Sequence, residues 1–296
     1  MKKPLIIACV IIVICSLLTV SLLLKFPFSP EPQASASPTP QTTAQITPQP
    51  TPANTVPPND PALAQAVTNG VNYARQIQES YGLLMLNVLY RQFGVPEFND
   101  SLQRYDQLIA DNSNAGLLHV FRRMASADVS AVQPEDFNTV TDQYDRLTVP
   151  ALYADSIALP DDYLAQLTDA IDRGGYMATH ALLATIWLQN NHATLQLPEN
   201  FTTALYQTNA ALIGDGTIVD DLQLEAAAFL YQAGQGNLVN SNFIRNVINA
   251  QFTNGGWSPT QDAPYNVNWH ASVLGVMILL YVQHPATSYP PMIPPS

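Results

Sequence analysis

Apolar residues recur at every third or fourth position through most of the chain after residue 60, which is the spacing of one helix face. Pro or Asp precedes several of these periodic runs, as at the starts of helices. Strand-like alternation is scarce, so the sequence predicts an all-α fold. The predicted helices span 62–79, 81–93, 99–111, 114–126, 134–146, 161–172, 176–191, 199–212, 219–233, 240–252 and 267–283.

Three segments within these helices, 81–90, 181–188 and 271–282, are apolar nearly all round. Each is shorter than the about 20 residues that cross a bilayer, so we expect buried core helices.

The C-terminal half contains a repeat. Glycine turns begin at residues 174, 214 and 255, and each follows an amphipathic helix and precedes a more apolar one. Two-helix units of about 40–47 residues are typical of stacked helical hairpins. The repeat therefore predicts either a closed α/α toroid with the apolar helices inside or an open array of hairpins.

The N-terminus has the pattern of a membrane anchor. Lys2 and Lys3 precede an uncharged run from Pro4 to Leu24, which as a helix would span about 31 Å. We expect residues 1–26 to be an uncleaved transmembrane signal-anchor, with the rest of the chain outside the cytoplasm. If the segment is instead a cleaved signal, the protein is secreted.

Residues 27–60 are rich in Pro, Thr, Ser and Gln and hold few large apolar side chains, which predicts a disordered stalk. The expected organisation is then an all-helical outer domain over 61–286 and a Pro-rich tail over 287–296. Both cysteines lie in the expected anchor, so the outer domain has no disulfide and no Cys-ligated zinc.

Charge excludes some partners. After residue 25 the chain has eight arginines and no lysine against 23 acidic residues. Nucleic acid needs a basic footprint, and anionic lipid attracts basic segments, so neither is an expected partner of the outer domain. The expected membrane contact is the N-terminal helix alone.

Residues 247–257, Val-Ile-Asn-Ala-Gln-Phe-Thr-Asn-Gly-Gly-Trp, contain a motif-like spacing of Gln251, Gly255 and Trp257. This segment resembles the QW motif of the terpenoid-cyclase and protein-prenyltransferase α/α-toroid superfamily. The resemblance implies that the Gln caps a neighbouring helix end and that the Trp stacks on the turn. It implies architecture only, because the superfamily's catalytic Asp-rich motif and zinc-binding Cys are missing.

Candidate catalytic residues are His180, Glu225 and His270, which lie 45 residues apart on the three apolar helices of the repeat. In a ring they would converge at one mouth. Two His and one Glu could bind a divalent metal such as zinc with an open fourth position. They could equally serve as acid–base groups, or hydrogen-bond one another in a purely structural role.

Candidate binding residues near the same mouth are Asp221, Tyr265, Trp257 and Trp269. Asp221 lies one turn before Glu225, and the aromatic residues flank the loop 254–270. A ring-stacking platform for a glycan or peptide is one interpretation, and packing of the turn is the other.

Two functions follow from these observations. The first is a membrane-anchored extracytoplasmic binding or scaffold domain, for which the stalk and the lack of a local catalytic motif speak. The second is an extracytoplasmic hydrolase or lyase with a His/Glu/His site, which could take a glycan, a peptide or a small molecule.

Overall fold

The computed structural model describes residues 56–260, 266–286 and 288–295. The predicted anchor and most of the predicted stalk lie outside these residues. The described residues form α-helices and short 3-10 turns, without a β-strand among them, which confirms the all-α class. Within this part of the chain no helix is long and apolar enough to cross a membrane.

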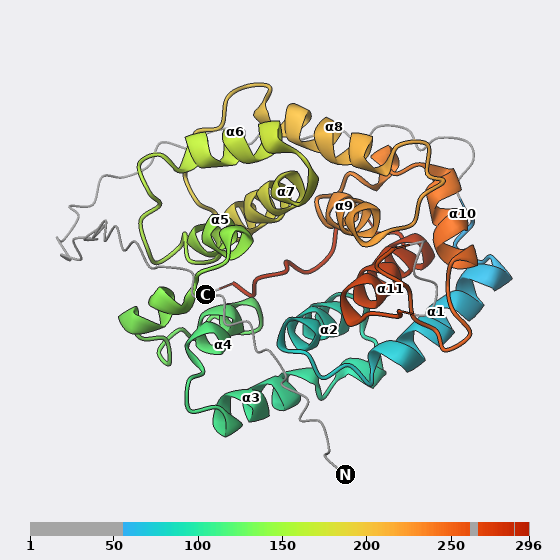
Figure 1. Cartoon of the computed structure of the whole chain (residues 1–296), viewed down its shortest axis with the longest axis horizontal. Helices are drawn as coiled ribbons and strands as arrows, with labels where there is room; N and C mark the ends of the chain where they lie inside the picture. The colour runs from blue at the N-terminus through green and yellow to red at the C-terminus, as the bar shows by residue number, and fades with distance from the viewer. Residues whose placement is uncertain (1–55, 261–265, 287, 296) are drawn as a thin grey trace, which may run out of the picture. The chain divides into compact units, whose positions relative to one another are not determined.

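The helices alternate along the chain between outer and inner positions, except where two inner helices follow one another with the 3-10 helix Pro134–Thr139 between them (Figure 1). The outer helices are α1 (Pro61–Ala74), α3 (Ser101–Asp111), α6 (Tyr163–Arg173), α8 (Phe201–Ile213) and α10 (Ser241–Asn249). The inner helices are α2 (Ser80–Phe93), α4 (Gly116–Phe121), α5 (Gln143–Leu152), α7 (Gly175–Asn190), α9 (Asp221–Gln232) and α11 (Trp269–Gln283). The helices pack in pairs, which is compatible with an α/α architecture.

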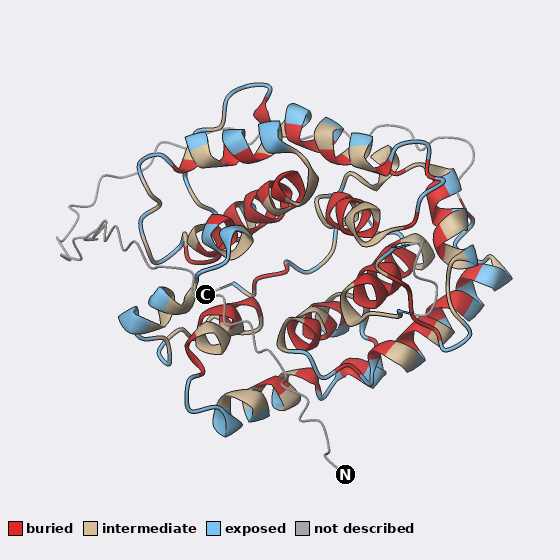
Figure 2. Cartoon of the chain, in the orientation of Figure 1, coloured by how far each residue is buried: buried red, intermediate tan, exposed pale blue. Residues whose placement is uncertain are grey.

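Burial follows the hydrophobic pattern of each helix. Most positions of α7 and α11 are buried, because apolar side chains lie on all sides of both helices (Figure 2). In α10 only Phe243, Ile244 and Val247 are buried, at the spacing of a single helix face. The predicted buried helices are thus confirmed.

The predicted helix over 134–146 is wrong. Pro134–Thr139 forms a short 3-10 helix, and α5 begins only after Asp142. The Asp142 carboxylate accepts hydrogen bonds from the backbone amides of Tyr144 and Asp145, which is the usual way to start a helix. This cap shifts α5 toward the C-terminus relative to the predicted range.

The segment that resembles a QW motif joins the last helix pair to the first. The Gln251 side chain donates to the carbonyl of Ala66 in α1 at 2.8 Å. Gly255 has a φ of 92°, and a methyl group there would lie 2.1 Å from the carbonyl oxygen of Asn69. The glycine therefore allows the turn to lie directly against the α1 backbone.

Residues 288–295 pack against the C-terminal ends of inner helices. Arg91, near the end of α2, donates to two backbone carbonyls of this segment at 2.6 and 2.9 Å, and Arg123 donates to a third at 3.1 Å. Met292 and Ile293 are fully buried. Most of the predicted Pro-rich tail is thus part of the packed helical unit.

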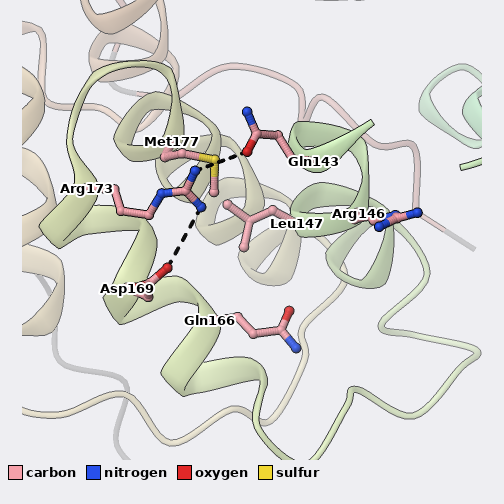
Figure 3. A pocket seen from close by; sticks show the side chains of 7 residues that line it. All are labelled: Gln143, Arg146, Leu147, Gln166, Asp169, Arg173 and Met177. Carbon is pink, nitrogen blue, oxygen red and sulfur yellow. Dashed lines mark hydrogen bonds and ion pairs between the residues drawn. The ribbon is translucent and has the colours of Figure 1, made fainter. Parts of the chain in front are cut away.

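A pocket of about 200 Å³ lies among α5, α6 and α7, on the outer side of the inner helices (Figure 3). Its lining consists of Gln143, Arg146, Leu147, Gln166, Asp169, Arg173 and Met177.

Candidate acid–base site

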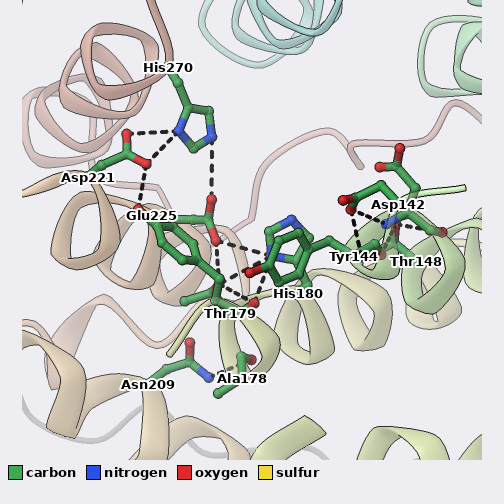
Figure 4. Close-up of polar contacts among 12 residues, drawn as sticks. Asp142, Tyr144, Thr148, Ala178, Thr179, His180, Asn209, Asp221, Glu225 and His270 are labelled. Carbon is green, nitrogen blue, oxygen red and sulfur yellow. Dashed lines mark hydrogen bonds and ion pairs between the residues drawn. The ribbon is translucent and has the colours of Figure 1, made fainter. Parts of the chain in front are cut away.

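The three predicted polar residues meet near the N-terminal ends of α7, α9 and α11 (Figure 4). One carboxylate oxygen of Glu225 lies 3.3 Å from Nδ1 of His180. The other lies 3.3 Å from Nε2 of His270. The 45-residue spacing therefore does bring these side chains together, because each one lies close to the same end of its helix.

Asp221 and Tyr176 hold His270 in place. Nδ1 of His270 lies 2.8 Å and 2.9 Å from the two carboxylate oxygens of Asp221. The Tyr176 hydroxyl donates to the same carboxylate at 2.9 Å. His270 thus has a carboxylate at each ring nitrogen, and both contacts are satisfied best when the ring is an imidazolium.

Glu225 is the buried centre of the cluster. Its side chain is 2% exposed, whereas the side chains of His180 and His270 are 20% and 30% exposed. The Thr179 hydroxyl donates to the Glu225 oxygen that faces His180. A buried carboxylate is costly unless it is paired and hydrogen-bonded, and here two imidazoles and a hydroxyl do this.

The ring of His180 is oriented by a backbone carbonyl. Its Nδ1 lies 2.8 Å from the carbonyl oxygen of Tyr176, which can only accept, so Nδ1 carries a hydrogen. Nε2 has no hydrogen-bond partner in the part of the chain that the structure describes. The Tyr144 ring packs on His180 with the centroids 4.6 Å apart. Nε2 is therefore free to exchange a proton with a ligand.

The electrostatics favour the charged form of both histidines. Burial lowers the pKa of His180, but the hydrogen bond and charge of Glu225 outweigh it and leave the pKa raised. Burial likewise lowers the pKa of His270, and the hydrogen bond and charge of Asp221 reverse this. Both groups therefore titrate above the ordinary pKa of 6.5.

A further carboxylate, Asp145 on α5, belongs to the same region. The Tyr81 hydroxyl donates to it at 3.0 Å. Burial raises the pKa of Asp145, and the hydrogen bond from Tyr81 and the charge of His180 oppose this. Asp145 thus adds a titratable group on the His180 side of the cluster.

The structure places the predicted binding residues that it describes in different environments. Asp221 lies in the cluster, as described above. Trp257 is 1% exposed and its indole nitrogen donates to the carbonyl of Val247 at 2.7 Å, so it packs inside the turn and offers no face to a ligand. Trp269 is partly exposed and lies edge-on to His270 with centroids 5.2 Å apart. Tyr265 lies outside the described residues.

Tyr144, Tyr176 and Thr179 belong to the site but were not predicted from the sequence. Tyr176 had a detectable signal, because it lies four residues before His180, just as Asp221 lies four residues before Glu225. Residues four apart share a helix face, so both pairs point toward the same centre. Tyr144 comes from a different helix outside the repeat and gave no such signal.

The cluster is not arranged as a metal centre. Among the described side chains, no group of three or more His, Cys, Asp or Glu is placed to hold a metal ion. Nδ1 of each histidine faces an oxygen acceptor, and both oxygens of Glu225 face imidazole nitrogens. A zinc site built from His180, Glu225 and His270 would require these contacts to break.

Comparisons of the chain with known protein families, with curated proteins and with solved structures found no match.

Proposed function

We propose that this protein is an acid–base enzyme, a hydrolase or lyase, with His180 and His270 as its catalytic residues and Glu225 as the residue that positions them. One observation carries the proposal. A carboxylate that is 2% exposed contacts two imidazoles from two other helices, and each imidazole keeps an exposed edge. Perturbed titratable groups of this kind gather at functional sites more often than elsewhere.

Each residue has a distinct role in this proposal. His180 exchanges a proton with the substrate through Nε2, because its Nδ1 hydrogen is held by the Tyr176 carbonyl. The neutral form of His180 accepts this proton from the attacking water in hydrolysis or from carbon in elimination, while that bond to oxygen or carbon forms or breaks, and the imidazolium then returns the proton to the leaving group. His270, between Asp221 and Glu225, supplies positive charge next to the developing negative charge of the transition state. Glu225 orients both rings.

The proposal includes a closed α/α toroid of six helix pairs, in which the 3-10 helix Pro134–Thr139 takes the outer position before α5. Support comes from contacts between the ends of the helical domain: α11 packs on α1 and α2, and Gln251 bonds to Ala66. The proposal also places the helical domain outside the cytoplasm, attached to the membrane by the predicted anchor and stalk. The pattern of the first 60 residues supports this placement. The substrate is then an extracytoplasmic molecule.

The second candidate function is a binding or scaffold domain without turnover. The observation that favours it is the pair of aromatic rings beside the histidines, Tyr144 at His180 and Trp269 at His270. Both are partly exposed and could stack on a sugar or a side chain.

The test compares the full-length protein in detergent with His180→Asn and Glu225→Gln on pools of glycans and peptides. A hydrolase releases new reducing ends or amines, and a lyase releases products with an ultraviolet-absorbing double bond. We expect turnover that falls by about 100-fold or more in both variants, the usual size of a general acid–base contribution.

The matched control is His192→Asn. His192 is exposed on the loop after α7 and has a φ of 51°, which Asn tolerates well, so this variant should keep full activity. If the wild type turns over no pool but binds one of them, and Glu225→Gln binds equally well, the enzyme proposal fails and the binding domain stands.

A further inference from the structure

Four of the eight arginines of the helical domain are buried or half-buried and bond within the fold: Arg91 and Arg123 to residues 288–295, Arg104 to the carbonyl of Arg75, and Arg122 to Asp106. The other four, Arg75, Arg146, Arg173 and Arg245, are exposed. The described residues offer Arg146 only the Val140 carbonyl at 3.4 Å, and they offer Arg173 an exposed hydrogen bond to Gln143 at 3.0 Å and the Asp169 carboxylate at 3.9 Å.

Arg146 and Arg173 line the same pocket among α5, α6 and α7. Figure 3 shows Arg173 reaching from α6 toward Gln143 on α5, to which it donates at 3.0 Å. The side chains of Leu147 and Met177 supply an apolar surface. Even with the Asp169 carboxylate, the pocket has one excess positive charge in a domain where acidic residues far outnumber basic ones.

The pocket adjoins the candidate acid–base site. Gln143 precedes Tyr144, whose ring packs on His180, and Met177 follows Tyr176, whose hydroxyl holds Asp221. Two residues of the pocket lining are thus chain neighbours of residues of the site, near the N-terminal ends of α5 and α7. A substrate that occupies both has to extend across these helix ends.

We propose that this pocket is a substrate subsite that binds the acidic group of a glycan. Guanidinium groups bind carboxylate and sulfate groups through paired, charge-assisted hydrogen bonds. The amides of Gln143 and Gln166 can bond to hydroxyls, and the Tyr144 ring offers a stacking surface between the pocket and His180. This inference rests on the proposed function of the neighbouring acid–base site, and it names an acidic glycan as the substrate class of that site.

The test measures binding rather than turnover, so that it is independent of the proposed chemistry. Full-length Glu225→Gln protein in detergent is titrated into a fluorescently labelled galacturonate hexamer, and anisotropy gives the dissociation constant. Arg146→Gln and Arg173→Gln are then added to this background. Arg245→Gln is the matched control, because Arg245 is an exposed arginine of α10, away from the pocket.

We expect each pocket substitution to weaken binding by about 10-fold, as for the loss of a charge-assisted hydrogen bond, and Arg245→Gln to have no effect. Binding should also weaken as salt is raised, since an exposed charge pair is screened.

A sulfated heparin hexamer that binds more tightly identifies sulfate as the acidic group. A neutral cellohexaose that binds as tightly overturns the inference, as does tight binding of an acidic glutamate peptide in place of the glycans. Galacturonate binding that neither arginine affects also overturns it, whether or not the wild type proves to be an enzyme.

Discussion

Nδ1 of His270 lies 2.8 Å from Oδ1 of Asp221, so the second residue of α11 is paired with the first residue of α9. This pair joins two inner helices at the edge of the cluster. It also decides the charge of His270, because burial alone would lower the pKa of that imidazole and Asp221 raises it.

We expect Asp221→Asn to lower the pKa of His270, since the charge of Asp221 is then lost and Glu225 alone opposes the effect of burial. Tyr176→Phe should change it less, because it removes only a hydrogen bond to Asp221 and leaves the charge. NMR titration of the imidazole resonances measures both. An unchanged His270 pKa in Asp221→Asn would show that Glu225 alone controls the ring.

The stability of the domain should depend on pH through the two histidines. Both have folded-state pKa values raised above 6.5. Their contacts with Glu225 and Asp221 therefore contribute fully below about pH 6.5, and this contribution is lost as the pH rises through the raised values. The melting temperature of the full-length protein should fall as the pH is raised above about 6.5, and the fall should be smaller in the His180→Asn/His270→Asn double variant.

The control for that experiment is His192→Asn, which should keep the wild-type pH profile because His192 is exposed and lies outside the cluster. A double variant with the wild-type slope would assign the pH dependence to other groups.

Gly255→Ala should strongly destabilise the fold. A left-handed φ costs a side chain about 1–3 kcal/mol, and the overlap with the Asn69 carbonyl adds about 1–3 kcal/mol. Gly94→Ala is the control, because Gly94 also has a positive φ but has nothing within 4 Å of the added methyl, so it should lose only about 1–2 kcal/mol. Urea unfolding of the two variants measures the difference, and equal losses would contradict the close approach of the turn to α1.

Arg122 and Arg123 are adjacent in sequence but should differ in how much each contributes to the free energy of unfolding. The Arg123 side chain is 1% exposed and donates to Asp155 at 2.7 Å and to the 288–295 segment, so Arg123→Ala should cost about 3–5 kcal/mol. Arg122 pairs with Asp106 near the surface, and Arg122→Ala should cost less than about 1 kcal/mol. Thermal unfolding checks both. A small loss in Arg123→Ala would mean that the segment 288–295 contributes little to stability.

Much of this architecture could be predicted from local patterns. The helical periodicity and the fully apolar runs in α7 and α11 define buried helices, because a helix without a polar face can only be stable inside a core. The equal spacing of His180, Glu225 and His270 placed them at one level, since repeated helix pairs put equivalent positions at equivalent heights. The repeat was therefore enough to predict that these three side chains converge.

Local patterns failed where a side chain overrode periodicity. The range 134–146 has helical spacing, but the Asp142 cap starts a new helix within it. The spacing around Trp257 allowed both packing of the turn and ligand binding, and its burial against the turn decided for packing. Spacing along the chain cannot distinguish these outcomes, because it does not include what lies on the far side of the turn.

By itself, the sequence determined the all-α class, the buried helices and the shared level of the three polar residues, because each depends on periodicity within a helix or between repeats. Only the tertiary structure decided which atoms meet: that Glu225 lies between two imidazoles, that Asp221 and Tyr176 hold His270, and that Arg123 holds residues 288–295. These contacts join helices from distant parts of the chain, and their geometry follows from how the helices pack against one another.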